Sequence, residues 1–270
     1  MAYDWITEAL EATWASVESL LSDRPEADFD RPTACPGWSV RDVLSHVLGI
    51  EAWLRGAPVP SYDAPMPDYV KNVMGEFNEA FVAAHRAETG ERVLEQFREA
   101  TTASLVALRA LSAEEWEIVG WSPEGERPYH RFMETRVLDS WIHLQDMRDA
   151  LLEPADDHGP GEQIVLNRFE AALPYVIGRR VGAAEGTIVR INLTGRLGRS
   201  VTIGVLEARA RALNSASREP DLELTTPVAL FWRRCAGRID AAAFLSASAT
   251  EVRGDQSLAE AVAESLNVMI

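Results

Sequence analysis

The segment from Tyr129 to Leu152 constrains the fold most, because it contains neither proline nor glycine. A run of this length without a helix breaker favours one long α-helix. Residues four apart lie on one face of a helix, so Asp139 and His143 point the same way. Apolar residues beside this pair predict that it lies at the edge of a core: Val137, Leu138, Trp141, Ile142 and Leu144.

Asp139 and His143 allow two interpretations. A carboxylate and an imidazole one turn apart can bind one metal ion, with Zn–O and Zn–N distances of about 2.0–2.2 Å. On a solvated helix face, the same pair would contribute only about 0.3 kcal/mol. The pattern is short and, taken alone, favours the solvated pair. A second histidine, His46, on another predicted helix favours the metal site.

The predicted helix that carries His46 begins at Ser39. Ser39 as N-cap, with Asp42 three residues later, has the pattern of a capping box. An apolar stripe follows, and His46 lies at its shoulder: Val40, Val43, Leu44, Val47 and Leu48. A lone histidine at such a place is more often a boundary residue than a ligand. Asp42 could also contact His46, but capping already explains it.

Helical periodicity predicts a bundle in the first half of the chain. Besides the helix that begins at Ser39 and the helix over 129–152, it predicts helices over 2–22, 68–87 and 90–111. A proline-rich loop over 56–67 crosses back over the helices, and another loop covers 120–128. Four principal helices and the crossing loop make the predicted domain, over residues 1–153, a four-helix bundle.

After residue 153 the pattern changes. Residues 153–161 are polar and rich in proline and glycine, which is typical of a linker. Beyond them the sequence predicts helices over 162–178, 227–235 and 257–266, and strands over 186–193, 200–205, 221–225 and 249–253. Pro227 is placed at the first position of its helix. The second domain, over 160–270, is therefore small and α+β, and the whole chain is α+β.

Charge and composition exclude several function classes. With 26 basic and 42 acidic residues, the net charge of −16 argues against nucleic acid and anionic membranes as partners. No apolar run approaches the ~20 residues that span a bilayer. The first residues lack the pattern of a signal peptide, so we expect a cytoplasmic protein.

The remaining candidate side chains have simpler interpretations. Two cysteines are too few for a disulfide framework or a thiolate zinc site, so Cys35 and Cys235 are predicted to be buried small residues. His85 and His130 are predicted on the surface, and His158 in the linker. No phosphate-binding glycine loop or catalytic serine motif is evident.

Two stretches together carry a family resemblance. Residues 33–42 (TACPGWSVRD) with His46, and residues 138–146 (LDSWIHLQD), resemble the mycothiol-dependent maleylpyruvate isomerase family. That family belongs to the DinB-like metal-binding four-helix bundles. The C-terminal half, with residues 251–255 and the helix after them, resembles its sterol-carrier-like α+β domain.

The resemblance implies a divalent metal, usually zinc, with His46, Asp139 and His143 as ligands. The characterised isomerase has glutamate where Asp139 stands; aspartate is one methylene shorter, so it must approach from a closer backbone or bind more weakly. Two nitrogens and one oxygen leave a fourth position open, as in catalytic zinc sites. A thiol in that position is deprotonated at neutral pH.

The leading hypothesis is a zinc-dependent enzyme with a mycothiol-type thiol as nucleophile. It would act on a small-molecule substrate as a cis–trans isomerase or as an S-transferase on electrophiles. One alternative is a non-enzymatic binder with an apolar, lipid-accepting groove in residues 160–270. Another is a regulatory protein that kept the bundle and lost the metal. The apolar content would allow a homodimer.

Overall fold

The computed structural model describes residues 3–215 and 218–269. The chain divides into two compact units, Met1–Ile164 and Val165–Ile270. The division falls inside helix α8 (Pro160–Tyr175), a few residues beyond the segment predicted to be a linker. The sequence-based domain limits of 1–153 and 160–270 stay a prediction.

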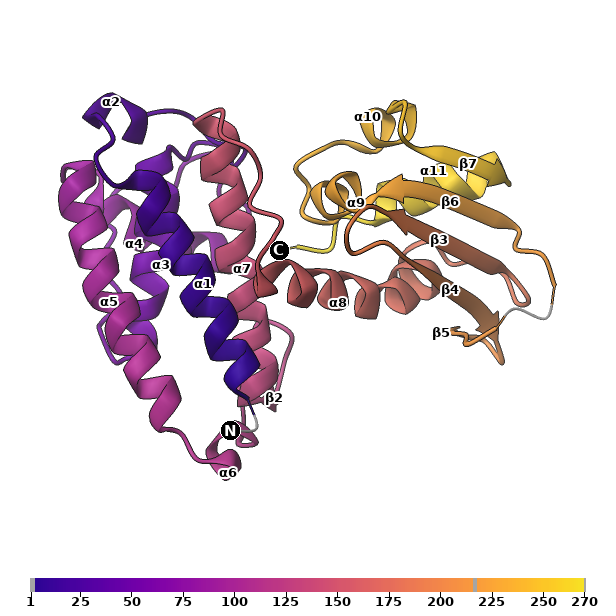
Figure 1. The fold of residues 1–270 in the computed structure, drawn as a ribbon, viewed down its shortest axis with the longest axis horizontal. Helices are drawn as coiled ribbons and strands as arrows, with labels where there is room; N and C mark the ends of the chain where they lie inside the picture. Colours follow the sequence, from indigo (N-terminus) through magenta and orange to yellow (C-terminus); the bar gives the residue numbers. More distant parts are fainter. Residues whose placement is uncertain (1–2, 216–217, 270) are drawn as a thin grey trace. The chain divides into compact units, whose positions relative to one another are not determined.

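The N-terminal unit is a bundle of long helices (Figure 1). They are α1 (Asp4–Leu21), α3 (Val40–Leu54), α4 (Val73–His85), α5 (Gly90–Ala110) and α7 (Tyr129–Ala150). Helix α3 contacts α4, α5 and α7, while α1 contacts α5 and α7. The predicted helical bundle is therefore confirmed, with α4 packed against α3.

Apolar stripes of these helices form one core. Fully buried members come from several helices, among them Ile6, Leu10, Val43, Leu44, Val93, Phe97, Val137 and Leu144. At Gly49 of α3, helix α4 approaches so closely that an added Cβ would lie 2.5 Å from the Cβ of Phe81. The predicted capping box at the start of α3 is confirmed, because Ser39 and Asp42 each accept a backbone N–H from the other.

The bundle differs from the prediction in its short elements. Helix α4 begins at Val73, five residues later than predicted, where the Asn72 side chain caps it by accepting from the Gly75 N–H. Two short helices, α2 (Glu26–Phe29) and α6 (Ala113–Trp116), lie in the connections. The loop predicted over 120–128 is flanked by a two-stranded antiparallel pair, β1 (Val119–Gly120) and β2 (Arg127–Pro128).

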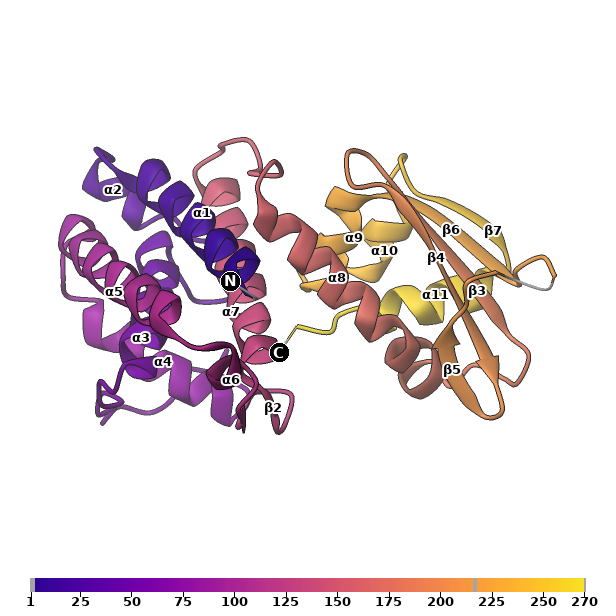
Figure 2. The same cartoon turned by 60° about the horizontal axis from the view of Figure 1, so that its bottom comes forward.

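In the C-terminal unit, the strands form a sheet in the order β5-β4-β3-β6-β7. They are β3 (Ile188–Thr194), β4 (Arg199–Leu206), β5 (Arg209–Ala212), β6 (Leu222–Pro227) and β7 (Glu251–Gly254). Central strands β3 and β6 pair in parallel. Helices α9 (Val228–Cys235) and α11 (Gln256–Ser265) pack on one face (Figure 2).

Burial in the sheet alternates along its central strands. Val189, Ile191 and Leu224 are buried, whereas Arg190 and Glu223 form an ion pair on the other, partly exposed face. This is the pattern of a sheet covered by helices on one side. The α+β class predicted for this half is confirmed.

The prediction missed strand β5 and helix α10 (Ala241–Ser246). It also placed Pro227 inside its helix, whereas Pro227 is the N-cap of α9. Helix α8 continues into a π-helical turn at Val176–Arg180, which begins two residues after Pro174. Among the described residues, no helix combines the length and the apolar content that a membrane span requires.

Candidate metal centre

Helices α3 and α7 bring the three predicted ligands together. His46 comes from α3, and Asp139 and His143 come from consecutive turns of α7. The Nε2 atom of His46 lies 3.3 Å from Asp139 Oδ2 and 3.5 Å from Oδ1. The Nε2 atom of His143 lies 3.5 Å from Asp139 Oδ1. One ligand atom from each residue lies within 4.8 Å of the others.

These distances suit a small cation. In a tetrahedral zinc site with bonds of about 2.05 Å, neighbouring ligand atoms lie roughly 3.3–3.4 Å apart. Asp139 Oδ1 lies 3.5 Å from each of the two Nε2 atoms, within a few tenths of an ångström of that spacing. The side chains of His46 and His143 are 4% and 6% exposed, against 19% for Asp139. Of the three side chains, Asp139 is therefore the one most exposed to solvent.

Arg136 holds the other oxygen of Asp139. Its Nη1 donates to Asp139 Oδ2 at 2.8 Å, while its Nε and Nη2 donate to Glu51 Oε1 at 3.2 and 3.0 Å. Glu51 is 1% exposed, so this is a buried ion pair. Oδ1, which accepts no hydrogen bond from Arg136, lies 3.5 Å from Nε2 of each imidazole.

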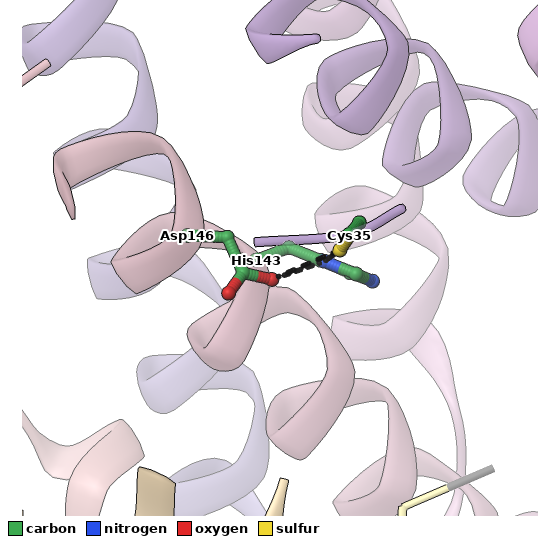
Figure 3. Close-up of side chains that lie close together, drawn as sticks. All are labelled: Cys35, His143 and Asp146. Atoms are coloured by element: carbon green, nitrogen blue, oxygen red, sulfur yellow. Dashed lines mark hydrogen bonds and ion pairs between the residues drawn. The ribbon is translucent and has the colours of Figure 1, made fainter. Parts of the chain in front are cut away.

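The far side of the His143 ring contacts a carboxylate and a thiol (Figure 3). Asp146 Oδ2 accepts a hydrogen bond from His143 Nδ1 at 3.0 Å. The Cys35 thiol donates to the same oxygen at 3.3 Å, and its sulfur lies 3.8 Å from Nδ1. Cys35, predicted only as a buried small residue, is buried against the candidate centre. The spacing of three residues between His143 and Asp146 was the available signal for their contact, because such residues share a helix face.

Trp38 covers both imidazoles. Its ring centroid lies 5.2 Å from that of His46 and 6.3 Å from that of His143. The indole Nε1 donates to Glu79 Oε2 at 3.0 Å, and Arg86 donates to Glu79 Oε1 at 2.7 Å. Glu79 has no exposed surface, so the Trp38 ring is anchored from inside the protein.

The pKa values of the two histidines shift in opposite directions. Burial lowers the pKa of His46, against the opposing effect of Asp139. Burial also acts to lower the pKa of His143, but Asp139, Asp146 and Cys35 outweigh it and raise that pKa well above 6.5. For Asp139, burial acts to raise the pKa, but His46, Arg136 and His143 hold it well below 3.8. Without a metal, these surroundings therefore favour the ionised form of Asp139 and the protonated form of His143.

The other candidate residues lie outside this cluster. His85 and His130 are half-buried rather than fully on the surface, and the side chain of His158 is 82% exposed. Asp42 serves the capping box and accepts a hydrogen bond from Arg86.

Among the described residues, Nδ1 of His46 is buried without a hydrogen-bond partner.

A family model identifies the helical unit. The model of the mycothiol maleylpyruvate isomerase N-terminal domain matches residues 10–148, just over half of the chain. The chain belongs to this family. The matched range contains every residue of the candidate centre, from Cys35 to Asp146. No curated protein sequence matches the chain.

Solved structures of the mycothiol-dependent maleylpyruvate isomerase share the fold. One has a TM-score of 0.57 and 15% identity, with 93% of each chain covered. A histidine-to-alanine mutant has a TM-score of 0.54 and 16% identity, with 88% of this chain and 90% of its own covered. Sterol carrier protein 2 from Yarrowia lipolytica covers 38% of this chain, with a TM-score of 0.31 and 17% identity. The isomerase matches extend the likeness over both units.

Proposed function

We propose that this family member is a metal-dependent enzyme that uses a low-molecular-weight thiol of the mycothiol type as nucleophile. The observation that carries the proposal is the convergence of His46 Nε2, His143 Nε2 and Asp139 Oδ1 at a partly exposed position. Zinc is the metal that this donor set favours, because two imidazoles and one carboxylate leave a further position for a thiol or water.

The formal charge of the centre also suits a divalent cation. The side chains linked by direct contacts include the carboxylates of Glu51, Asp139 and Asp146 and the guanidinium of Arg136. These acidic groups lie around the candidate ligands, and their negative charge would stabilise a bound dication.

The residues of the chain then have separate tasks. His46, Asp139 and His143 would hold the cation, which when bound favours the thiolate form of an entering thiol. Arg136 keeps one oxygen of Asp139 occupied, and the anchored Trp38 ring excludes water from the buried side of the imidazoles. The incoming thiol would approach from the side of Asp139, where the cluster is exposed.

For the reaction we propose cis–trans isomerisation of a small electrophilic alkene, and we propose maleylpyruvate as the first substrate to test. The thiolate adds to the activated cis double bond and forms a C–S bond. The resulting single C–C bond rotates, and cleavage of the C–S bond restores the double bond in the trans form. S-transfer would use the same addition or displacement but retain the C–S bond in the product.

Elemental analysis of the untagged protein tests the proposal first. We expect about one zinc per chain, and loss of that zinc in His46→Ala and His143→Ala with the bundle still folded, since both helices carry their own apolar stripes. The control is His158→Ala, because that side chain is 82% exposed and lies outside the cluster. Zinc-loaded protein should then isomerise maleylpyruvate only when mycothiol is added.

Two results would contradict the proposal. Stoichiometric metal in both histidine variants would refute the ligand set. A wild-type protein that takes up no metal from zinc solutions would refute metal dependence, and would turn attention to ligand binding by residues 160–270.

A further inference from the structure

We propose that Asp146 and Cys35 are positioning residues that fix the His143 ring through its Nδ1 atom. This inference rests on the proposed function in one respect, namely that Nε2 of His143 binds a metal. Neither residue is among the proposed ligands. Their role is argued from contacts on the opposite side of the ring.

The hydrogen bond to Asp146 determines which nitrogen of the His143 ring carries a proton. A carboxylate only accepts, so the 3.0 Å contact between Asp146 Oδ2 and His143 Nδ1 places a proton on Nδ1. With Nδ1 protonated, the lone pair of a neutral ring is on Nε2, which faces His46 and Asp139. A hydrogen bond from the other ring nitrogen to a carboxylate is the usual arrangement of a metal-binding histidine.

Cys35 supports the same carboxylate oxygen of Asp146. Its thiol donates to Asp146 Oδ2 at 3.3 Å, the same oxygen that accepts from His143. Asp146 is 1% exposed, and an isolated buried carboxylate would be costly. The thiol therefore helps to satisfy the carboxylate and fixes the oxygen that orients the ring. In this arrangement Cys35 is a hydrogen-bond donor rather than a metal ligand.

The short segment from Cys35 to Trp38 places the Cys35 thiol beside Asp146. Gly37 has φ +78° and lies so close to Tyr69 that an added Cβ would be 2.2 Å from its ring. Beside it, Trp38 is hydrogen-bonded to the buried Glu79. The Cys35-to-Trp38 segment is thus fixed at its Trp38 end, with the Cys35 thiol on one side of the candidate centre and the indole against the imidazoles.

Zinc affinity, measured by competition with a chelator, is the quantitative test. Asp146→Asn should weaken zinc binding about 10–100-fold, the range typical for a residue that supports a metal ligand. Cys35→Ala should weaken it by roughly 3–10-fold, since it removes one neutral donor. Cys35→Ser keeps a donor and should recover most of this loss. Cys235→Ala, which changes a buried cysteine of the other unit, is the matched control and should leave the affinity unchanged.

The spectrum of the cobalt-substituted protein separates a positioning residue from a ligand. We expect no thiolate-to-cobalt charge-transfer band in the wild type, and altered ligand-field bands in Asp146→Asn and Cys35→Ala. A charge-transfer band that disappears in Cys35→Ser would overturn the proposal, because Cys35 would then be a ligand. Wild-type zinc affinity in a folded Asp146→Asn variant would overturn it as well.

A measurement on metal-free protein distinguishes failure of this inference from failure of the proposed function. In nitrogen-15 spectra of histidine-labelled wild type, the Nδ1–H of His143 should be visible and slow to exchange. It should exchange faster in Asp146→Asn and in Cys35→Ala. If no metal binds but this signal behaves as expected, only the metal proposal fails. If the signal is absent, Asp146 and Cys35 do not position the ring.

Discussion

At Arg136, a single guanidinium joins a candidate ligand to a fully buried acid. It bonds to Asp139 with one nitrogen and to Glu51 with two others. Removing one partner of a buried ion pair leaves the other charge without compensation, which is costlier than removing both. The side chain therefore supports both the stability of the bundle and the orientation of Asp139.

Arg136→Met should lower the free energy of unfolding by roughly 3–5 kcal/mol, because Glu51 would be left buried and unpaired. The double variant Arg136→Met/Glu51→Gln should recover a large part of that loss. Urea unfolding of the metal-free proteins measures both values. Equal stability of the single and double variants would show that Glu51 does not depend on Arg136.

The pH dependence of the metal-free site follows from His143. Its pKa in the folded protein is raised, chiefly by Asp139 acting against burial. Folding then gains stability from His143 that is fully present below pH 6.5, the ordinary pKa, and is lost as pH rises through the raised value. We expect nuclear magnetic resonance titration of the ring to give a pKa above 6.5, and a lower one in Asp139→Asn. A wild-type pKa at or below 6.5 would contradict this.

Residue by residue, the site was only partly predictable. His46, Asp139 and His143 were chosen from helical spacing and family resemblance, and they do converge. The position of Cys35 against Asp146 could not be predicted, because 111 residues separate them and no local pattern records that approach. A contact between segments so far apart in the sequence can be identified only from the folded structure.

Of the two helices that carry the site, α3 makes a close contact with α4. Gly49 lies three residues after His46, at the place where Phe81 of α4 packs on the backbone of α3. Here the absence of a side chain is what allows the two helices to approach. The spacing of α3 and α4 thus depends on one residue.

Gly49→Ala should destabilise the protein by about 1–2 kcal/mol, since overpacking outweighs the gain in helix propensity. The nearest atom is the Cβ of Phe81, which cannot rotate away, so the backbones must move apart. Gly120→Ala is the control, because an added Cβ there meets nothing within 4 Å. Thermal or urea unfolding compares the two, and a stabilised Gly49→Ala variant would contradict the packing argument.

Element prediction succeeded where the signals were local. The capping box of α3, the long α7 and the strands β3 and β4 were all predicted from neighbouring residues. Strand β5 was missed because its four residues are arginine and alanine in alternation, and pairing with β4 decides their conformation. Helix α10 has only six residues, too few for a periodic pattern.

At the scale of the whole molecule, more of the N-terminal unit than of the C-terminal unit could be predicted from the sequence. The N-terminal unit contains the whole candidate centre, and its motifs carried the family resemblance. For the C-terminal unit the α+β class was predicted, but not the parallel pairing of β3 with β6, whose partners are 33 residues apart. Such pairing joins distant parts of the chain, so periodicity within either strand does not specify it.

The spacing of the site residues along α7 limits where the chain can accept insertions or deletions. Arg136, Asp139, His143 and Asp146 follow one another at intervals of three or four, with no proline or glycine between them. Each inserted residue rotates everything after it by about 100° around the helix axis. A one-residue insertion between Arg136 and Asp146 would therefore separate the carboxylates and the imidazole at once. Homologues that keep this chemistry should vary in length outside that stretch, and most easily in the exposed turn between β1 and β2.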